Sequence, residues 1–428
     1  MKFRIYTLGC KVNQFESGAV SKQLTENGYE AAADNEKADI TVINSCAVTA
    51  ASEQKAYKLI RRIRREEPDT VILFTGCMAQ VDNEESRLSD NVDIILGNKR
   101  RGDIIPVLED YFAGKEKIIR IEPYRHRDEY ENLSADNFSD RTRAFLKIED
   151  GCNRFCSYCI IPYARGRVRS CSLDYIDGQI KTFAAKGYKE AVMVGINLSS
   201  YGSDNGRKFS DAVKTACEAA DIRIRLGSLE PESMDTDTLK IFSSYKNFCP
   251  QFHLSLQSGC DGTLRRMNRH YTTAEYEKIV SDIRNIFENP SITTDVMVGF
   301  CGETEEEFAE SVEFVRKTGF AKVHVFPYSR RPGTAADRAG GHLSNEIKKQ
   351  RAELMSKAAE ESRRDFLKNQ VGRTEKVLLE TRRKDGKYEG YTPNYTPVLV
   401  SADESLVNTI VNVKITDTDG DTCFGELT

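Results

Sequence analysis

Residues 148 to 170 read IEDGCNRFCSYCIIPYARGRVRS, and three cysteines in this stretch decide how the chain is read. Cys152, Cys156 and Cys159 form a C-x3-C-x2-C run directly after a predicted strand, Ala144 to Glu149. Three thiolates at this spacing can ligate three irons of a cubane cluster. The fourth iron then stays open to a small molecule that offers an amine and a carboxylate. We therefore expect an iron–sulfur cluster that binds such a molecule.

This cysteine run opens a series of alternating strand and helix patterns. Helical patterns such as Thr273 to Phe287 and Glu305 to Thr318 separate the strands, which predicts a parallel sheet. Six such units are too few to close an eight-stranded barrel. We predict an open, partial (βα)6 barrel over residues 143 to 370, with its chemistry at the C-terminal ends of the strands. Its last part, Ser344 to Gln370, is one charged helix. The predicted strands are Ala144 to Glu149, Glu190 to Val194, Arg223 to Leu226, Gln251 to Leu256, Thr293 to Val298 and Lys322 to Pro327.

The first part of the chain, residues 1 to 122, shows the same alternation and predicts a doubly wound parallel sheet. Cys10, Cys46 and Cys77 each directly follow a predicted strand. Because the C-termini of parallel strands share one edge of a sheet, the three thiols should meet there and hold a second cluster. The alternative is three buried, inert cysteines. The predicted strands are Lys2 to Gly9, Asp39 to Ser45 and Thr70 to Gly76, and the predicted helices are Phe15 to Asn27 and Ala50 to Arg65.

Two further segments complete the predicted organisation. Residues 123 to 142 are charged and poor in aliphatic side chains, which is typical of a linker. Residues 371 to 428 contain short β patterns and predict a small β-barrel. Those patterns are Lys376 to Glu380, Val398 to Ser401, Thr409 to Thr416 and Thr422 to Leu427. The remaining cysteines share no spacing and are interpreted as packing or surface residues: Cys171, Cys217, Cys249, Cys260, Cys301 and Cys423.

The composition favours a cytoplasmic protein. The 428 residues are 39% hydrophobic and 30% charged, no apolar run approaches the roughly 20 residues that span a bilayer, and the N-terminus lacks the apolar core of a secretory signal. In a reducing compartment, twelve cysteines point to metal or catalysis rather than disulfides. A structural zinc site with Cys171 as fourth ligand is the alternative for the cysteine run, although structural zinc usually takes C-x2-C pairs. The net charge of -4 argues weakly against a general nucleic-acid binder.

With these residues in view, the chain is similar to the methylthiotransferases of the radical S-adenosylmethionine superfamily over nearly its whole length. TLGCKVNQFES, INSCAVT and FTGCMAQ resemble the motifs of the family's N-terminal cluster, and residues 148 to 170 resemble its radical motif. RIRLGSLEP, HLSLQSGCD, DVMVGFCGETEEEF and VHVFPYS resemble the segments that close its barrel strands. GYTPNYTPV resembles its terminal TRAM-like RNA-binding β-domain. Cys171 stands where the family usually has Arg and Cys301 where it has Pro, both outside the cluster motifs.

The resemblance implies a reaction. A [4Fe-4S] cluster on Cys152, Cys156 and Cys159 would bind S-adenosylmethionine and cleave it with an electron from a low-potential donor such as a flavodoxin or ferredoxin. The resulting 5′-deoxyadenosyl radical would take hydrogen from C2 of an adenine. A second [4Fe-4S] cluster, on the three N-terminal cysteines, would supply a methylated sulfur. Radical chemistry suits this step because the C–H bond has no acidic proton for a general base to remove.

Lys11, Val12 and Asn13, directly after Cys10, resemble the branch that acts on N6-threonylcarbamoyladenosine next to the anticodon in tRNA. The alternatives are the branches that act on isopentenyladenosine in tRNA or on a side chain of a ribosomal protein. From other classes, the chain could be a non-catalytic iron–sulfur electron carrier or sensor, or a zinc-stabilised RNA-binding protein. A carrier needs no large barrel cavity, which argues against that interpretation.

Polar residues and glycines that follow strand ends form the expected S-adenosylmethionine rim. Taken singly, each of them more often has a turn or capping role. His253 and His324 lie inside strand patterns and are expected to be core residues. The residues at strand ends are Gly195, Asn197, Ser228, Glu230, Gln257 and Glu303. Tyr158, inside the C-x2-C step, is also expected to lie against the cofactor, with packing on the core as its alternative.

The expected RNA contacts lie in the terminal domain, where basic side chains beside aromatic rings suit phosphate contact and base stacking. A solvated hairpin with core tyrosines is the alternative. The expected contacts are Arg382, Arg383, Lys384, Lys387, Tyr391 and Tyr395. Two other basic groups are read as a solvated helix face (Arg61, Arg62, Arg64 and Arg65) and as contacts to RNA or cofactor (Arg165, Arg167 and Arg169).

Overall fold

The computed structural model of this protein describes residues 1–81, 91–125, 128–135 and 142–428. Its N-terminal part is a six-stranded, wholly parallel sheet with the order β2-β1-β3-β4-β5-β6. Helices cover both faces, because α1 and α4 pack into one apolar cluster with the sheet and α2 and α3 into another. The predicted doubly wound sheet is confirmed. The strands are β1 (Lys2–Thr7), β2 (Glu30–Ala31), β3 (Ile40–Ser45), β4 (Val71–Gly76), β5 (Ile94–Leu96) and β6 (Ile118–Arg120), and the helices are α1 (Lys11–Glu26), α2 (Ala50–Glu66), α3 (Cys77–Val81) and α4 (Ile104–Gly114).

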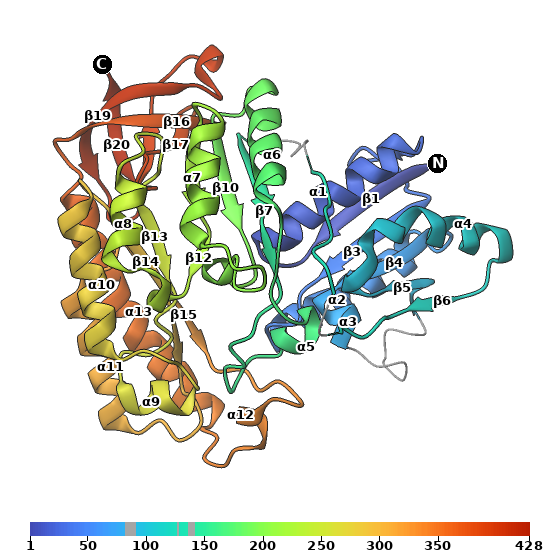
Figure 1. The fold of residues 1–428 in the computed structure, drawn as a ribbon, viewed down its shortest axis with the longest axis horizontal. Coiled ribbons are helices and arrows are strands. Elements are labelled where there is room, and N and C mark those ends of the chain that lie inside the picture. The colour runs from blue at the N-terminus through green and yellow to red at the C-terminus, as the bar shows by residue number, and fades with distance from the viewer. Residues whose placement is uncertain (82–90, 126–127, 136–141) are drawn as a thin grey trace.

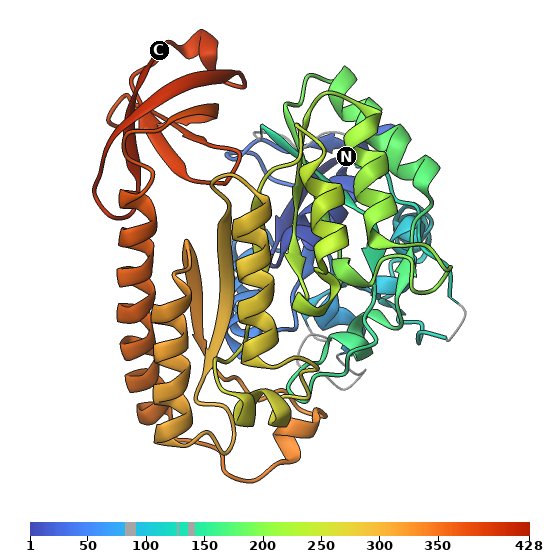
Figure 2. The same cartoon turned by 60° about the vertical axis from the view of Figure 1, so that its left-hand side comes forward.

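The central part is an open barrel of parallel strands, as predicted. It consists of a sheet β11-β10-β7 and a sheet β12-β13-β14-β15, in which β12 continues the course of β11 after Gly227. Helices lie on the outer side of these strands (Figures 1 and 2). The strands are β7 (Arg143–Lys147), β10 (Glu190–Val194), β11 (Arg223–Leu226), β12 (Ser228–Leu229), β13 (Gln251–Leu254), β14 (Ser291–Val298) and β15 (Lys322–Pro327). The outer helices are α6 (Leu173–Ala185), α7 (Phe209–Ala219), α8 (Thr236–Ser243), α10 (Thr273–Ile286), α11 (Glu305–Thr318) and α13 (Asn345–Lys368). Short elements at the strand ends are β8 (Glu149–Asp150), β9 (Arg169–Ser170), α5 (Ile161–Arg165), α9 (Asp261–Arg266) and α12 (Ala335–Arg338).

The C-terminal part is a closed five-stranded barrel with the order β16-β17-β18-β20-β19, which confirms the predicted small β-barrel. The long helix α13 leads into it (Figure 2). It sits at the N-terminal ends of the central strands, where Arg223 donates to the carbonyl of Lys376 at 2.6 Å and Arg225 to that of Pro393 at 2.9 Å. Among the described residues, no helix is both long and apolar enough to cross a membrane. The strands are β16 (Thr374–Arg382), β17 (Tyr388–Tyr391), β18 (Pro397–Val400), β19 (Ile410–Thr418) and β20 (Cys423–Leu427).

The largest difference from the predicted elements concerns the start of α1. The helix begins at Lys11 rather than Phe15, because Cys10 is its N-cap and the Asn13 side chain accepts the backbone N–H of Cys10 at 3.2 Å. The short strands β2, β5, β6 and β17 escaped prediction because so few residues show no period. The predicted linker is not a free tether, since Leu133 and Ala135 are buried in the core of the central barrel; residues 126–127 and 136–141 of it lie outside the described ranges.

A fully buried carboxylate joins the N-terminal sheet to the central barrel. Glu16 of α1 lies 3.0 Å from Arg101 and 3.4 Å from Lys147 at the end of β7, and Arg165 of α5 donates to both of its oxygens. Asp150 accepts from Lys147 at 3.0 Å and from Arg165 at 3.4 Å. Burial opposes a charge on Glu16, but Arg101, Arg165 and Lys147 outweigh it and hold the pKa of the carboxyl below its usual value.

Replacing Glu16 by alanine should lower the free energy of unfolding by about 3–5 kcal/mol, because it leaves buried cations without their shared partner. Urea unfolding followed by circular dichroism measures this change. Since the pKa of Glu16 is lowered on folding from its usual 4.5, its contribution is complete above about pH 4.5 and is lost as the pH falls toward the folded pKa.

Glu26→Ala on the same helix is the matched control, because Glu26 is exposed and lies 3.8 Å from Lys22. This change should lower the free energy of unfolding by less than about 1 kcal/mol. Equal losses in the two variants would contradict the role given to the buried carboxylate.

Candidate functional site

The three N-terminal cysteines meet at one edge of the sheet, as their positions after strands predict. Cys10 follows β1, Cys46 follows β3 and Cys77 follows β4, and these three strands are neighbours. Each thiol lies in the electrostatic field of the others. Cys46 accepts the backbone N–H of Val48 at 3.5 Å, and Cys77 accepts Nε of the buried Arg165 at 3.1 Å.

The other three cysteines occupy the loop that follows β8. Their thiols also lie in one another's fields. Cys152 Sγ accepts the Asn197 side-chain amide at 3.7 Å, and Cys156 Sγ accepts Nη1 of Arg269 at 3.5 Å. Cys171, the fourth ligand that a zinc site would need, is instead buried in the barrel core.

A cavity of about 180 Å3 lies between Cys159 of the second set and the loop that follows Cys46 of the first. Val48 and Thr49, which follow Cys46, form one side of it, and Tyr158 and Cys159 form another. The remaining wall comes from the barrel and the segment after β15, namely Ile160, Ile161, Gln257, Asp295, Met297, Phe326, Pro327, Tyr328 and Ser329. The cavity, called the chamber below, is therefore bordered by the loop after Cys46 on one side and by the loop that carries Cys159 on another.

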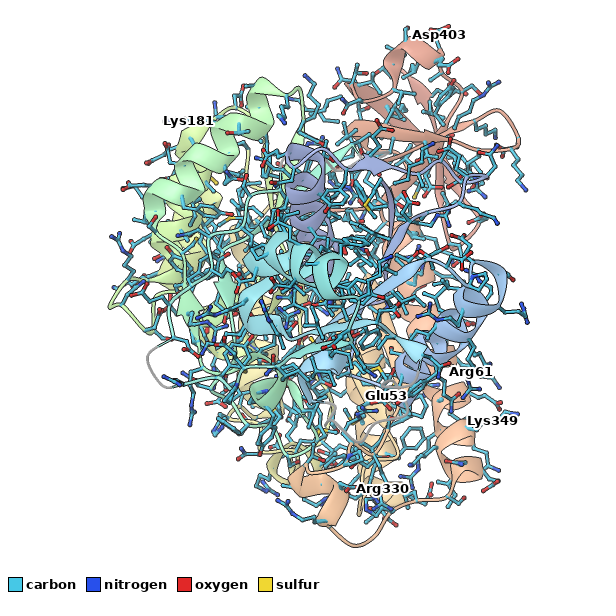
Figure 3. All side chains as sticks on the ribbon, turned by 90° about the vertical axis from the view of Figure 1, so that its right-hand side faces the viewer. Glu53, Arg61, Lys181, Arg330, Lys349 and Asp403 are labelled. Atoms are coloured by element: carbon cyan, nitrogen blue, oxygen red, sulfur yellow. The ribbon has the colours of Figure 1, made fainter. Side chains whose placement is uncertain are left out.

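Two contacts hold the N-terminal loop against that chamber. The backbone N–H of Ala50 donates to the Ser329 hydroxyl at 3.3 Å, and Glu53 of α2 pairs with Arg331. Glu53 lies close to the segment that carries Arg330, as Figure 3 shows. The N-terminal domain thereby closes the open side of the barrel.

The expected rim residues differ in their burial and in their hydrogen-bond partners. Asn197 and Gln257 are buried near the cysteines and the cavity, and Tyr158 lines the cavity with its ring edge-on to Phe300 at 6.3 Å. Glu230 pairs with Arg269, which links it to Cys156. Ser228 is exposed and Gly195 half-buried.

Glu303 differs from the other rim residues because its carboxylate already has partners. It accepts the backbone N–H of Gly299 at 2.7 Å and Nη1 of Arg351 at 2.6 Å. These bonds give Glu303 the turn-holding role that was its alternative; contact with the cofactor stays a prediction.

Three buried oxygens at the rim have no hydrogen-bond partner within the described chain, namely Asn197 Oδ1, Gln257 Oε1 and Glu149 Oε1. A buried oxygen without a hydrogen bond destabilises the fold unless a ligand or a water molecule supplies a donor. Gln257 also holds a left-handed backbone conformation, with φ of 65°, and strain of this kind concentrates at functional sites. The unpaired acceptors suit the ammonium and ribose hydroxyls of S-adenosylmethionine, so the residues present fit this cofactor.

The thiols and their neighbours suit iron–sulfur ligation by their chemistry, whereas within the described residues no three potential ligands are already arranged as a metal site. Burial, with a smaller contribution from neighbouring thiols, raises the pKa of Cys46 and of Cys152 to about 12. Iron binding replaces the protons, because the thiolate is the ligand. Arg165 and Arg269, which donate to Cys77 and Cys156, supply positive charge beside each set.

Comparison with known proteins gives a consistent assignment. Family models match consecutive parts of the chain: the uncharacterized protein family UPF0004 at residues 2–97, the radical SAM superfamily at 146–315 and the TRAM domain at 368–428. A threonylcarbamoyladenosine tRNA methylthiotransferase MtaB from Aquifex aeolicus is 37% identical, over 91% of this chain and 97% of its own. The protein of the same name from Thermotoga maritima is 38% identical, over 92% and 89%. The chain belongs to the radical S-adenosylmethionine methylthiotransferase family.

More distant similarities extend this result. A tRNA-2-methylthio-N(6)-dimethylallyladenosine synthase from Pelotomaculum thermopropionicum is 32% identical, over 97% of this chain and 95% of its own. The structure of the radical S-adenosylmethionine methyltransferase TsrM from Kitasatospora setae has a TM-score of 0.57 at 13% identity and covers 78% of this chain and 77% of that one. At that identity the likeness concerns the fold alone.

Sequence reasoning missed Arg269 of this site and gave Arg165 a different role. Arg269 is buried between Glu230 and Cys156, with its guanidinium over the ring of Tyr271 at 5.1 Å. Arg165 was assigned to RNA or cofactor, but it is fully buried on Cys77 and Glu16. A basic residue directly after a cysteine motif was the available signal for Arg165; nothing in the sequence distinguishes Arg269.

The structure separates the six expected RNA contacts into two groups. Arg382, Arg383 and Lys384 are exposed on the β16–β17 hairpin, and Lys387 lies over the ring of Phe424. Tyr391 and Tyr395 are half-buried and stack on each other, on the side that meets the central barrel. RNA contact stays a prediction for both groups.

The α2 arginines fit the solvated interpretation in part. Arg62 and Arg65 are exposed and pair with Glu66, whereas Arg64 is half-buried and pairs with Asp93 at 2.8 Å.

The raised thiol pKa values predict slow alkylation of the iron-free protein. At pH 8, iodoacetamide should modify Cys46 and Cys152 at least about 100-fold more slowly than in urea-unfolded protein, because only thiolate reacts and an ordinary thiol has a pKa of about 8.5. Mass spectrometry of the modified peptides over time measures both rates.

The pH profile separates a raised pKa from simple shielding. Between pH 8 and 10 the folded rates should keep rising about tenfold per unit, whereas the unfolded rates level off near the ordinary pKa. Parallel profiles for folded and unfolded protein would contradict the assignment.

Proposed function

We propose that this protein attaches a methylthio group to C2 of N6-threonylcarbamoyladenosine next to the anticodon in tRNA. The observation that carries the proposal is the single chamber between Cys159 and the loop directly after Cys46, because a radical and a sulfur donor must reach the same adenine. The relatives named for this reaction, at 37% and 38% identity, support the choice of substrate.

The chain has residues suited to hold each group that the reaction needs. Cys152, Cys156 and Cys159 would hold one [4Fe-4S] cluster, and the thiols that follow β1, β3 and β4 would hold the second. When bound, these clusters and S-adenosylmethionine supply a radical able to take hydrogen from an unactivated C–H bond and a sulfur able to be methylated and transferred.

The remaining residues position and enclose these groups. Asn197 and Gln257 offer unpaired acceptors to S-adenosylmethionine, and Tyr158 provides an apolar ring face. Met297 and Phe326 line the chamber with apolar surface and exclude water, which protects a reactive radical. Arg165 and Arg269 hold sulfur atoms of the two sets in place.

The proposal includes partners and location. tRNA is the macromolecular partner, and the terminal domain, which matches the TRAM model, is expected to contribute to its binding. A low-potential donor such as a flavodoxin or ferredoxin is expected to supply the electrons in the cytoplasm. Four segments share the proposed function. Residues 1–122 hold the sulfur donor and residues 123–142 form the linker. Residues 143–370 carry out the radical chemistry, and residues 371–428 contact the RNA.

Deletion of the gene should abolish 2-methylthio-N6-threonylcarbamoyladenosine in bulk tRNA digests analysed by mass spectrometry. Wild-type protein should restore the nucleoside, and Cys156→Ala and Cys46→Ala should not. Loss of a methylthio-dimethylallyladenosine signal instead would move the protein to the branch of its relatives with that name. No change in any methylthio nucleoside would contradict the proposed activity.

Iron analysis tests the second cluster independently of activity. Anaerobically reconstituted wild-type protein should hold about eight irons per chain, since each cubane contains four. Cys46→Ala and Cys156→Ala should each retain roughly half. Cys217→Ala, a buried cysteine on α7 outside both sets, is the control and should retain the wild-type value. Four irons in wild type and in Cys46→Ala would exclude the second cluster.

A further inference from the structure

Lys11 is a cation without an ion-pair partner among the described residues, directly after the first cysteine of the N-terminal set. It is the first residue of α1, directly after Cys10, and its side chain is accessible to solvent although protein surrounds it on most sides. Within the described part of the chain it makes no hydrogen bond or close ion pair. Its strongest electrostatic neighbours are two further cations, Arg225 and Arg143, followed by Glu190.

The carboxylates near Lys11 are already engaged by arginines. Glu190 is held by Arg225 through two bonds of 2.6 and 2.9 Å. Glu380 is held by Arg143 at 2.9 and 3.0 Å. The ammonium of Lys11 therefore remains as uncompensated positive charge, and such a group favours an anionic ligand.

Two aromatic rings lie beside Arg143 and Arg225, the strongest electrostatic neighbours of Lys11. Tyr391 and Tyr395 stack with their centroids 4.6 Å apart. The Arg143 guanidinium lies 4.9 Å from the Tyr395 ring and that of Arg225 lies 4.6 Å from it. The Tyr391 hydroxyl donates to Glu389 at 2.8 Å, which occupies that carboxylate as well. All three domains thus contribute to the surroundings of Lys11.

Three polar side chains, Asp295, His253 and His324, lie between the chamber and the surroundings of Lys11. Asp295 lines the chamber and bonds His253 at 3.2 Å, and the His253 ring lies 6.0 Å from that of His324. His324 is exposed and within electrostatic reach of Lys11. It shares a strand face with Phe326, which lines the chamber, because alternate strand residues point the same way. A substituent that extends from the chamber toward Lys11 would meet polar rather than apolar walls.

We propose that Lys11 binds the carboxylate of the threonyl group on N6 of the substrate adenosine and so selects this substituent. The inference rests on the proposed function. The N6 group carries the carboxylate at its far end, and the polar side chains Asp295, His253 and His324 extend from the chamber to within electrostatic reach of Lys11. An adenosine with an apolar N6 group would leave Lys11 and the polar wall without partners, and sites built for a polar group discriminate strongly against such analogues.

The experiment compares two RNAs and four proteins. The RNAs are anticodon stem-loops with N6-threonylcarbamoyladenosine, one with its free carboxylate and one with the carboxyl group as the primary amide. The proteins are reconstituted wild type, Lys11→Met, Lys11→Arg and Lys214→Met, in which the last removes an exposed lysine on the outer helix α7. Fluorescence anisotropy gives Kd and single-turnover assays give the rate of methylthiolation.

Wild type and Lys214→Met should bind and convert the carboxylate RNA about 10- to 100-fold better than the amide RNA, the usual worth of a hydrogen bond between charged groups. Lys11→Met should lose this preference and treat both RNAs alike. Lys11→Arg, which keeps the charge, should retain part of the preference, and unchanged iron content shows that the neighbouring Cys10 still holds its cluster.

Two outcomes would overturn the inference. If Lys11→Met keeps the wild-type preference for the carboxylate RNA, residue 11 does not contact the carboxylate. If Lys11→Met binds both RNAs more weakly by the same factor, Lys11 contacts a backbone phosphate instead. A wild type that prefers the carboxylate RNA in binding but leaves it unmodified would overturn the proposed reaction and support the role of Lys11.

Discussion

The structure depends on one buried carboxylate, Glu16. It lies on the helix that follows the first cysteine of the N-terminal set and binds Arg165, which closes the helix after the radical motif. Lys147, the last residue of the first barrel strand, binds the same carboxylate. Buried charges of this kind are tolerated only when each has a partner in good geometry. The network therefore fixes the angle and distance at which the N-terminal sheet meets the barrel.

That fixed contact has a chemical consequence. Arg165 donates from Nε to Cys77 while its terminal nitrogens bind Glu16, so the same side chain orders the domain contact and the second cysteine set. Arg269 has the corresponding place beside Cys156, where Glu230 holds it. Each set of thiols has a buried arginine against it, and the chamber lies between Cys159 and the loop that follows Cys46. In the proposed reaction, a radical and a sulfur donor would approach the substrate from these two sides.

Most of the architecture was predictable because the elements are long and periodic. The strands at Glu190–Val194, Arg223–Leu226 and Lys322–Pro327 have the predicted bounds. The sequence also singled out six candidate cluster cysteines, since strand ends and C-x3-C-x2-C spacing are local features, and the structure places three of them after the neighbouring strands β1, β3 and β4. Elements of two to four residues, such as β2 and β17, were missed because so short a stretch carries no pattern. The early start of α1 was missed because cysteine is not a usual capping residue.

The sequence by itself determined which residues carry the chemistry and on which elements they lie, because metal-ligand spacing and hydrophobic periodicity are properties of consecutive residues. Only the tertiary structure decided which distant residues share a site. In the folded chain, Tyr391 and Tyr395 face the central barrel and Arg165 is buried against Cys77. Lys11 has no ion-pair partner among the described residues. These placements follow from how three domains pack, and packing depends on contacts between residues far apart in the chain, which no local pattern encodes.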